Sequence, residues 1–403
     1  MPREIQRLLN TCLDGAARTE FHAAGGSVPA FQVCGGAGFM LAVAASLALA
    51  WRTGLAEWAV LSLAAFGAMT FLALAMFVKV VTGVERLVYY HHEIAVVAAS
   101  ALLLRLLRLP LPPYLDIAVL GLGLFLGCGR IGCFMVGCCH GRPHRWGVRY
   151  TAGHARAGFS ECYVGVRLLP LQALESLWVL VVTSIGIALV WRGARPGAAF
   201  GWYVAAYSLG RFAFEFLRGD ADRPYAWGFS EAQWTSLILV SGVALAEAWA
   251  HAPYSRWHAA AGAGLVVAMT GVSLVRRFRV TRTDRLLHPR HLQEVAELVR
   301  AIGTAELPAN PAVHVRRTSL GIQISGSSRQ ELDSRVRHYA LSGLDDALLE
   351  GSALVLAALI ARLDRAGGKP DELIRSNRGV FHFAIREVGE RAYQSRRPRL
   401  PML

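Results

Sequence analysis

The chain has 403 residues, a formal net charge of +14 and 54% hydrophobic side chains, but only 17% charged residues. This apolar content excludes an intrinsically disordered chain, and a basic soluble nucleic-acid-binding protein would carry more charge. The charge is uneven, because residues 276–403 hold 22 basic and 14 acidic residues and so contribute +8 of the +14. We therefore predict no nucleic-acid partner and three regions: a polar N-terminal segment 1–27, a transmembrane domain 28–275 and a basic soluble domain 276–403.

A helix that crosses a membrane needs about 20 consecutive, mostly apolar residues. Eight runs of this kind occur, with imprecise ends: 30–51, 56–83, 93–112, 114–138, 168–191, 198–217, 233–251 and 258–275. One such run could be a buried helix of a soluble protein, but a whole series cannot hide its apolar surface in that way. The sequence predicts an all-α polytopic membrane protein with seven or eight transmembrane helices, followed by a small soluble α+β C-terminal domain.

The side of the membrane on which the C-terminus lies depends on the number of spans. The arginine-rich end after residue 275 favours a cytoplasmic C-terminus under the positive-inside rule. The loop 140–167 is also rich in arginine, and it lies on the opposite side from the C-terminus if there are seven spans. An eighth span reverses that placement, so charge alone leaves both topologies open.

Three clusters of ionisable residues interrupt the apolar segments, and the first is His91-His92-Glu93 at the entrance to the third span. Ionisable groups inside or beside a span are costly, so they are functional candidates by default. The alternative for each histidine is a solvated side chain at the membrane interface.

The second cluster is the glycine-rich run from Gly127 to Arg142 at the end of the fourth span. Glycines allow helices to pack closely or a backbone to approach a ligand, and packing explains most of them. Packing does not explain Arg130, which lies well inside the apolar run. An arginine at that depth needs an anion, either a carboxylate or a lipid phosphate.

The same run is rich in cysteine, with Cys128, Cys133, Cys138 and Cys139 followed by His140. A thiolate metal site is the sharper interpretation. However, the first three cysteines recur every five residues, which spreads them around a helix, and no C-x-x-C motif occurs. We therefore expect Cys128 and Cys133 to be small packing residues, and we expect no metal and no other cofactor. A loop outside the cytoplasm would allow a disulfide from Cys138 or Cys139 to Cys162.

The fifth span begins with Leu169-Pro-Leu-Gln172-Ala-Leu-Glu175. A proline suits the first turn of a helix, and Gln172 and Glu175 are three residues apart and share a face. Glu175 can simply favour the positive end of the helix dipole, so this segment alone is typical of a structural role.

The third cluster lies at the end of the sixth span, where Tyr207, Arg211, Glu215 and Arg218 form one polar stripe on a helix. Arg211 and Glu215 are four residues apart and can pair directly. One interpretation is a self-neutralised ion pair that holds helices together. The other is a functional site, which is what charges inside a membrane more often mark.

The residues after 275 predict an α+β domain. Val313–Ile324 alternates in part like a strand, and Val380–Ile385 predicts another strand. Asp345–Arg365 predicts a helix of about 20 residues that is too interrupted to span a membrane.

Taken together, these motifs resemble the prolipoprotein diacylglyceryl transferase family of the bacterial inner membrane. The family signature G-R-x-G-N-F-x-N-G-E-x-x-G-R is similar to residues 129–142, which are G-R-I-G-C-F-M-V-G-C-C-H-G-R. The family segment H-P-S-Q-L-Y-E resembles residues 169–175, and its late motif of Tyr, Arg, E-F-x-R and Asp resembles Tyr207 to Asp220. The resemblance covers about residues 28–252, with the motifs in the same order.

The chain departs from the family pattern at the signature and at the third span. The Asn, Asn and Glu positions of the signature are Cys133, Val136 and Cys138 here. The family histidine lies in an H-G-G context, whereas this sequence offers His91-His92-Glu93. Residues 276–403 match no known part of the family.

The resemblance implies transfer of a diacylglyceryl group from phosphatidylglycerol to the lipobox cysteine of prolipoproteins, at a multi-pass protein of the bacterial cytoplasmic membrane. It implies no cofactor, because arginines can stabilise the departing phosphate. Its partners would be phosphatidylglycerol, other membrane lipids and prolipoprotein signal peptides. The catalytic residues it implies are His91 or His92 as the base for the thiol, Arg211 on the departing phosphate and Tyr207 beside it. The substrate-binding residues it implies are Arg130, Arg142, Gln172, Glu175, Glu215 and Arg218, with Arg130 on the lipid head group and with Gln172 and Glu215 orienting the arginines.

Three alternatives stay open at this point. A paralogue could act on another acceptor or lipid head group. A membrane thiol-redox or metal-binding protein could use Cys133, Cys138, Cys139 and His140. A transporter could line a pathway with the polar stripe, although the sequence shows no internal repeat.

Overall fold

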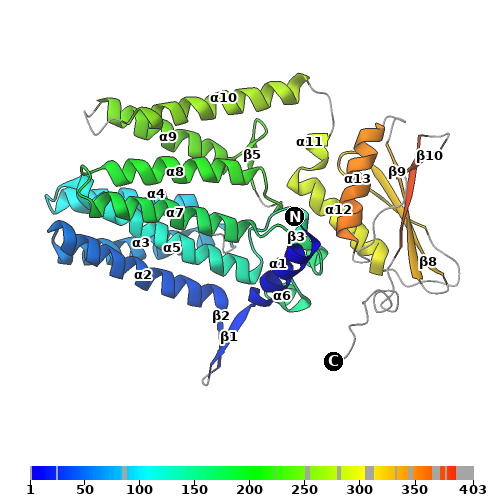
Figure 1. Cartoon of the computed structure of the whole chain (residues 1–403), viewed down its shortest axis with the longest axis horizontal. Coiled ribbons are helices and arrows are strands. Elements are labelled where there is room, and N and C mark those ends of the chain that lie inside the picture. Colours follow the sequence, from blue (N-terminus) through cyan, green and yellow to red (C-terminus); the bar gives the residue numbers. More distant parts are fainter. Residues whose placement is uncertain are drawn as a thin grey trace, which may run out of the picture.

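The computed structural model describes most of the chain. The described residues are 2–23, 26–83, 89–221, 223–249, 255–278, 283–304, 313–331, 334–343, 348–364, 373–376 and 379–386. Figure 1 shows that they form a bundle of long helices, with a smaller part made of helices and a sheet beside one end of it.

Each of the eight predicted apolar segments forms a long helix. These helices are α2 (Ala30–Thr53), α3 (Glu57–Thr82), α4 (Tyr89–Leu106), α5 (Leu111–Val136), α7 (Leu171–Trp191), α8 (Ala198–Glu215), α9 (Glu231–Trp249) and α10 (Arg256–Phe278). Among the described residues, five helices are long and apolar enough to cross a membrane, namely α2, α3, α5, α7 and Arg256–Arg277 of α10. The protein is therefore a mostly helical membrane protein, and the count of seven or eight spans stays a prediction.

Helix α5 is the most buried of these five and packs against α2, α7 and α8. Prolines occupy its first turn, where a missing N–H costs nothing. It ends at Gly137, whose φ of 91° places it in the left-handed conformation common after a helix. The helix is therefore two residues shorter at this end than the predicted span 114–138, and the chain turns away from the bundle axis there.

Helix α8 is fixed to α5 at its N-terminus by Asp116. The carboxylate accepts hydrogen bonds of 2.7 Å from the backbone N–H groups of Gly197 and Phe200. A carboxylate at that end satisfies unpaired N–H groups and matches the positive end of the helix dipole. The register of α8 against α5, and with it the position of its polar stripe, is therefore defined.

The predicted polar N-terminal segment contains α1 (Arg3–Ala16) and a hairpin of β1 (Glu20–Ala23) and β2 (Gly26–Pro29). The loop between α5 and α7 contains β3 (Pro143–Arg149), α6 (Ala152–Arg156), the 3-10 turn η1 (Glu161–Tyr163) and β4 (Arg167–Leu168). Asp14 of α1 pairs with Arg167 at 2.9 Å, so the N-terminal helix lies on this loop. A short hairpin of β5 (Tyr225–Ala226) and β6 (Phe229–Ser230) joins α8 to α9.

The C-terminal part contains an antiparallel sheet in the order β10-β11-β9-β8-β7. Its strands are β7 (His314–Arg317), β8 (Gln323–Glu331), β9 (Ser334–Ser342), β10 (Ile374–Arg375) and β11 (Phe381–Arg386), and its helices are α11 (Thr283–Leu286), α12 (Pro289–Thr304) and α13 (Glu350–Leu363). Helix α13 lies within the helix predicted over residues 345–365. Strand β11 nearly coincides with the strand predicted over residues 380–385. The stretch Val313–Ile324, predicted to alternate in part like a strand, contains β7 and the start of β8, and a turn at Thr318–Gly321 separates them.

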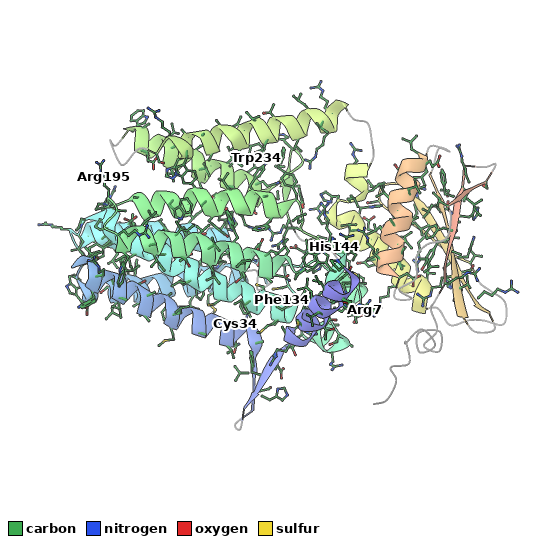
Figure 2. The ribbon with its side chains drawn as sticks, viewed as in Figure 1. Arg7, Cys34, Phe134, His144, Arg195 and Trp234 are labelled. Atoms are coloured by element: carbon green, nitrogen blue, oxygen red, sulfur yellow. The ribbon has the colours of Figure 1, made fainter. Side chains whose placement is uncertain are left out.

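The C-terminal part and the loop between α5 and α7 share one hydrophobic core. Val148 and Tyr163 of the loop region belong to the same buried cluster as Val295 of α12 and Leu356 of α13. Figure 2 places His144 at this end of the bundle and Arg195 at the opposite end. The loop and the C-terminal part therefore lie at the same end of the helical bundle.

Candidate functional site

Seven charged side chains gather at the end of the bundle that faces the C-terminal part. We refer to them as the arginine cluster: Arg130 of α5, Glu175 of α7, Arg211 and Glu215 of α8, and Arg218, Asp220 and Arg223 of the segment after α8. Residues from three helices and one connecting segment thus meet at one place, although they are up to 93 positions apart in the sequence.

Glu175 lies at the centre of the arginine cluster with only 3% of its side chain exposed. Its Oε1 atom accepts a hydrogen bond of 2.7 Å from Arg211 and lies 3.5 Å from Arg218. Its Oε2 atom lies 2.9 Å from Nε of Arg130. A role at the helix dipole therefore does not account for this residue, because its carboxylate holds three guanidinium groups together.

The predicted pair of Arg211 and Glu215 is present, with Nη2 and Oε1 2.5 Å apart. Arg211 therefore bridges two carboxylates, Glu215 on its own helix and Glu175 on α7. Tyr207, one turn earlier on α8, is buried, stacks on Tyr203 and meets the ring of Tyr90 from α4. The polar stripe predicted for α8 therefore faces the interior of the bundle.

The segment after α8 adds a second layer of ion pairs. Arg218 is fully buried and holds Asp220 through two hydrogen bonds of 2.7 and 2.9 Å. Arg223 contacts both Asp220 and Glu215, at 3.2 and 2.9 Å. Burial alone would raise the pKa of Asp220, but Arg218 and Arg223 outweigh it and hold this pKa well below its ordinary value.

The arginine cluster does not neutralise itself. Among its described members, four arginines face three carboxylates, which leaves an excess of one positive charge. Buried charges are expensive unless they are paired, so an excess cation in this place is suited to an anionic ligand. The interpretation of the α8 stripe as a self-neutralised pair therefore explains only part of the site.

Two further predicted residues contact backbone. The amide Nε2 of Gln172, which is fully buried, donates a hydrogen bond of 2.6 Å to the carbonyl of Cys138. Nε of Arg142 donates to the carbonyl of Arg218 at 3.2 Å, and the Arg142 backbone N–H donates to that of Leu217. Gln172 thus fixes the loop after α5, and Arg142 fixes the segment that carries Arg218.

The helices that form this site lie within the part of the chain that matches a known family. The sequence profile described as prolipoprotein diacylglyceryl transferase matches residues 37–249, which is more than half of the chain. The chain belongs to the prolipoprotein diacylglyceryl transferase family. The match includes every helix that contributes to the arginine cluster.

Individual relatives agree with the family assignment. The transferase named phosphatidylglycerol–prolipoprotein diacylglyceryl transferase 2 of Clostridium perfringens is 35% identical over 134 residues, which is 32% of this chain and 49% of the relative. The phosphatidylglycerol–prolipoprotein diacylglyceryl transferase of Clostridium tetani is 34% identical over 128 residues, which is 31% of this chain and 49% of the relative. The phosphatidylglycerol–prolipoprotein diacylglyceryl transferase 2 of Streptomyces coelicolor is 32% identical over 141 residues, which is 34% of this chain and 42% of the relative. The aligned part thus spans about half the length of these relatives.

The two histidines of this diacylglyceryl transferase family member occupy different surroundings. His91 is half-exposed and its Nε2 contacts the carboxylate of Glu231 at the start of α9. His92 is buried and its ring packs against Phe71 of α3, with the ring centroids 4.5 Å apart. Neither arrangement assigns the base, so the role of either histidine as the proton acceptor stays a prediction.

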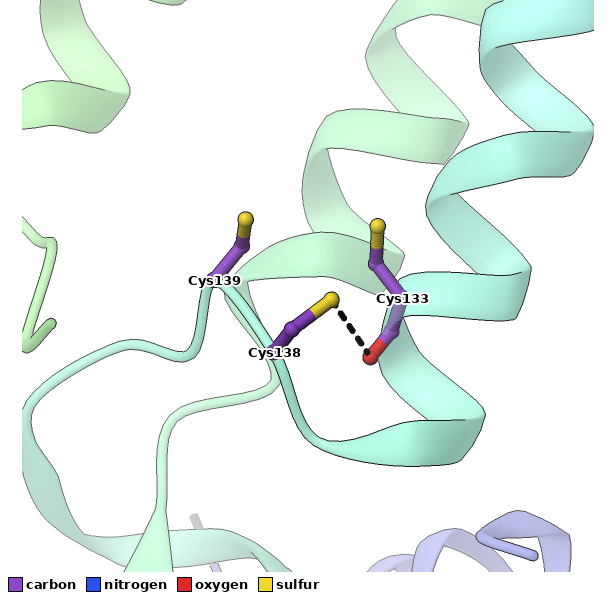
Figure 3. Close-up of side chains that lie close together, drawn as sticks. All are labelled: Cys133, Cys138 and Cys139. Carbon is purple, nitrogen blue, oxygen red and sulfur yellow. Dashed lines mark hydrogen bonds between the residues drawn. The ribbon is translucent and has the colours of Figure 1, made fainter. Parts of the chain in front are cut away.

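The cysteines correct one expectation from the sequence. Cys128 packs against α2 at Gly38, as predicted. Cys133, Cys138 and Cys139, however, are not spread around a helix, because α5 ends at Val136 and the chain folds back. Their sulfur atoms all lie within 4.8 Å of one another, as Figure 3 shows.

The predicted partners of these cysteines lie elsewhere. All seven cysteines belong to the described part of the chain and all are free, and Cys162 lies 3.2 Å from the hydroxyl of Ser160. Among the described residues, no disulfide joins Cys162 to Cys138 or Cys139. His140 is buried, contacts the carbonyl of Gly141 and packs on Tyr163, so it does not join the three sulfur atoms. Burial lowers the pKa of His140, which favours the neutral ring.

Arg223 is a site residue that the sequence motifs did not indicate, and it contacts two carboxylates of the arginine cluster. A signal was available, since Arg223 follows Asp220 by three residues. The C-terminal part also reaches this segment, because Arg290 donates a hydrogen bond of 3.1 Å to the carbonyl of Arg223. No feature of the sequence predicts this contact between Arg290 and Arg223, because the two residues are 67 positions apart.

Proposed function

We propose that this protein transfers the diacylglyceryl group from phosphatidylglycerol to the lipobox cysteine of prolipoproteins, forming a thioether and releasing glycerol 1-phosphate. The names of the aligned relatives support this activity. The observation that carries the proposal is the arginine cluster, in which three guanidinium groups converge on Glu175 beside apolar helices. A lipid phosphate is an anion of the kind that its excess positive charge would bind.

The reaction requires a thiolate, a leaving phosphate and a site that excludes water. The thiol loses its proton, and its sulfur attacks the glycerol carbon that carries the phosphoester. The carbon–oxygen bond breaks, and the phosphate keeps the electron pair. Arginines at fixed positions stabilise that developing charge, and they do so more strongly in a site with few water molecules.

The proposed roles of the residues depend on this chemistry. Arg130 would bind the phosphatidylglycerol head group, because its guanidinium lies at the end of α5 next to the apolar bundle. Arg211 would stabilise the departing phosphate, and Tyr207 would donate a hydrogen bond beside it. Glu175 and Glu215 would hold the guanidinium groups in place, since each contacts at least two arginines.

Three further assignments complete the proposed site. Gln172 would hold the loop after α5, and Arg142 would hold Arg218 in place through the Arg218 carbonyl. His91 or His92 would accept the thiol proton, because histidine is the side chain that most often acts as a general base in enzymes.

We also propose eight transmembrane spans in the bacterial cytoplasmic membrane. The N-terminal helix, the loop between α5 and α7 and the C-terminal part lie at one end of the bundle, which requires even numbers of crossings between them. Four helices lie between α1 and this loop, and four lie between the loop and α11. The other three proposed spans, α4, α8 and α9, contain polar residues that make them less apolar than their neighbours.

The activity can be measured as a mass shift. A lipobox peptide is incubated with the protein in vesicles that contain phosphatidylglycerol, and the expected product carries one diacylglyceryl group. Arg211→Ala is expected to abolish the shift, and Arg195→Ala is the matched control because Arg195 lies at the opposite end of the bundle. A peptide that is modified equally by wild type and Arg211→Ala would contradict the proposal.

A second candidate is a related transfer to another acceptor or from another lipid head group. The replacement of the signature residues by Cys133, Val136 and Cys138 favours this candidate, because Cys133 lies near Arg130 of the arginine cluster. The two candidates are distinguished by testing other anionic lipids as donors and other thiols as acceptors. The combination of lipid and thiol that yields product identifies the reaction.

A further inference from the structure

The three thiols of Cys133, Cys138 and Cys139 form a compact group at the end of α5. Their sulfur atoms lie within 4.8 Å of one another, and Figure 3 shows them facing one space between the helix end and the loop. Cys138 is exposed and the other two are half-buried, so the group is accessible from outside. The proposed transfer assigns these thiols no role.

The backbone around this group is held in an unusual shape. Gly137 ends the helix with its N–H on the carbonyl of Cys133, and the following chain turns back. Cys139 has a φ of 58°, a left-handed conformation that costs a residue with a Cβ about 1–2 kcal/mol. Gln172 fixes the Cys138 carbonyl at 2.6 Å. The buried amide of Gln172 thus helps to hold the loop that brings the sulfur atoms together, even though the conformation of Cys139 is strained.

The spacing of the sulfur atoms suits a thiophilic metal ion. Zinc–sulfur bonds of about 2.3 Å at tetrahedral angles place two sulfur atoms about 3.8 Å apart. The sulfur atoms of the three cysteines lie within 4.8 Å of one another, so no pair is more than about 1 Å further apart than this. Zinc sites with three protein ligands keep a fourth position for water or substrate and are typical of catalysis, whereas structural sites are closed by four.

The surroundings also match the charge of such a site. A zinc ion with three thiolates carries one negative charge, and nearby guanidinium groups favour such a charge. Arg130 and Arg218 both lie within electrostatic range of Cys139, and Arg130 precedes Cys133 by one turn of α5. The zinc site would therefore lie near two members of the arginine cluster.

We propose that Cys133, Cys138 and Cys139 bind one zinc ion whose open position takes the thiol of the acceptor substrate. The role of the thiol rests on the proposed transfer, whereas the metal site stands on the cysteine geometry alone. Two of these cysteines occupy the signature positions where the related family pattern has asparagine and glutamate, so the site would be specific to chains with this replacement.

The step balances without an oxidant or a reductant. The acceptor thiol binds zinc as a thiolate and releases its proton to solvent or to a nearby base. Its sulfur then forms a bond to the glycerol carbon, the carbon–oxygen bond breaks, and the electron pair leaves with the phosphate. The resulting thioether is neutral and is a weaker ligand than a thiolate, so the product leaves and zinc keeps its oxidation state.

The metal content of the purified full-length protein tests the site. After equilibration with zinc and removal of the unbound ion, we expect one zinc per chain in wild type. We expect a loss of at least about ten-fold in Cys133→Ser and in Cys139→Ser, because two remaining thiolates bind zinc weakly. Cys128→Ser is the matched control, since Cys128 lies on the same helix but packs against α2. No zinc in wild type, or equal zinc in all variants, would overturn the proposal.

The open position is tested with cobalt in place of zinc. The sulfur-to-cobalt charge-transfer absorption is expected to increase when a peptide with a lipobox cysteine is added, and to stay constant with the serine version of the peptide. Cobalt bound without a response to the cysteine peptide would overturn the substrate-thiol role. Because neither readout requires turnover, a metal-loaded protein that binds the thiol peptide but forms no lipid product would count against the proposed transfer alone.

Discussion

Arg211 of α8 donates a hydrogen bond of 2.7 Å to Glu175 of α7, and both side chains are at least 95% buried. This contact joins two helices whose sequence motifs are 36 residues apart. Because Glu175 also pairs with Arg130 and Arg218, a change at this one carboxylate affects every helix of the site.

Glu175→Gln keeps the volume of the side chain and removes its charge. Four arginines then face only two carboxylates, and removing one partner of a buried ion pair typically destabilises a protein by about 3–5 kcal/mol. We expect a clear fall in the thermal unfolding midpoint in detergent. The control is Glu161→Gln, whose pair with Arg300 is largely exposed and whose loss should cost less than about 1 kcal/mol. Equal midpoints for both variants would contradict a central role of Glu175.

Arg211→Lys tests whether charge alone is sufficient at this position. Lysine is a point charge, whereas the planar guanidinium of Arg211 contacts Glu175 and Glu215 with two different nitrogens. We expect a folded protein with transfer reduced about 100- to 1000-fold, the range seen when one fixed donor is removed from a site of charge stabilisation. The measurement is product formed per time at saturating lipid. Full activity in the lysine variant would show that geometry at Arg211 is not required.

Asp220 gives the site a defined response to acid. Burial raises its pKa, but Arg218 and Arg223 outweigh burial and hold the pKa below the value of about 3.9 found in unfolded chains. A carboxylate with a lowered pKa contributes stability above its unfolded pKa, and that contribution is lost as the pH falls toward its folded pKa. We expect the difference in unfolding midpoint between wild type and Asp220→Asn to be constant from about pH 7 to pH 5 and to shrink below about pH 4. A difference that already shrinks between pH 7 and pH 5 would assign the effect to another group.

The sequence predicted the helices of the bundle well, because a membrane span has a simple apolar signature. It also predicted the pairing of Arg211 with Glu215, which depends only on helical spacing within α8. It did not predict that Glu175 pairs with Arg211, since this contact depends on how α7 packs against α8. Alone, Glu175 looked structural because its partners come from other helices.

The error on the cysteines has a different physical cause. The five-residue spacing spreads Cys133 and Cys138 around a helix only if the helix continues through both. Gly137 ends α5 between them, and its left-handed φ is what allows the chain to fold back. A glycine in an apolar run is ambiguous, since it can serve helix packing or helix termination. The sequence alone does not distinguish these uses.

Two glycines of α5 show the same ambiguity and give a matched pair of substitutions. A Cβ added to Gly123 would lie 2.2 Å from the hydroxyl of Thr183 on α7 and 2.7 Å from the ring of Tyr203 on α8. A Cβ at Gly129 would meet nothing within 4 Å. We expect Gly123→Ala to destabilise the bundle by about 1–3 kcal/mol, the usual cost of overpacking, and Gly129→Ala to leave the unfolding midpoint unchanged or raised. Similar losses of stability in both variants would contradict the explanation by packing.

The number of spans is testable because the loop between α5 and α7 and the C-terminal part share one core. Reporter enzymes that are active on one side of the membrane can be fused after Gly158 in the loop, after Gly193 between α7 and α8, and after Phe278 at the end of α10. With eight spans, the fusions after Gly158 and Phe278 report the same side and the fusion after Gly193 reports the other side, because four helices separate the first two points and one helix separates the loop from Gly193. An odd number of crossings after the loop would instead place Phe278 with Gly193. In that case the membrane would separate α12 and α13 from the loop, and their shared hydrophobic core could not form.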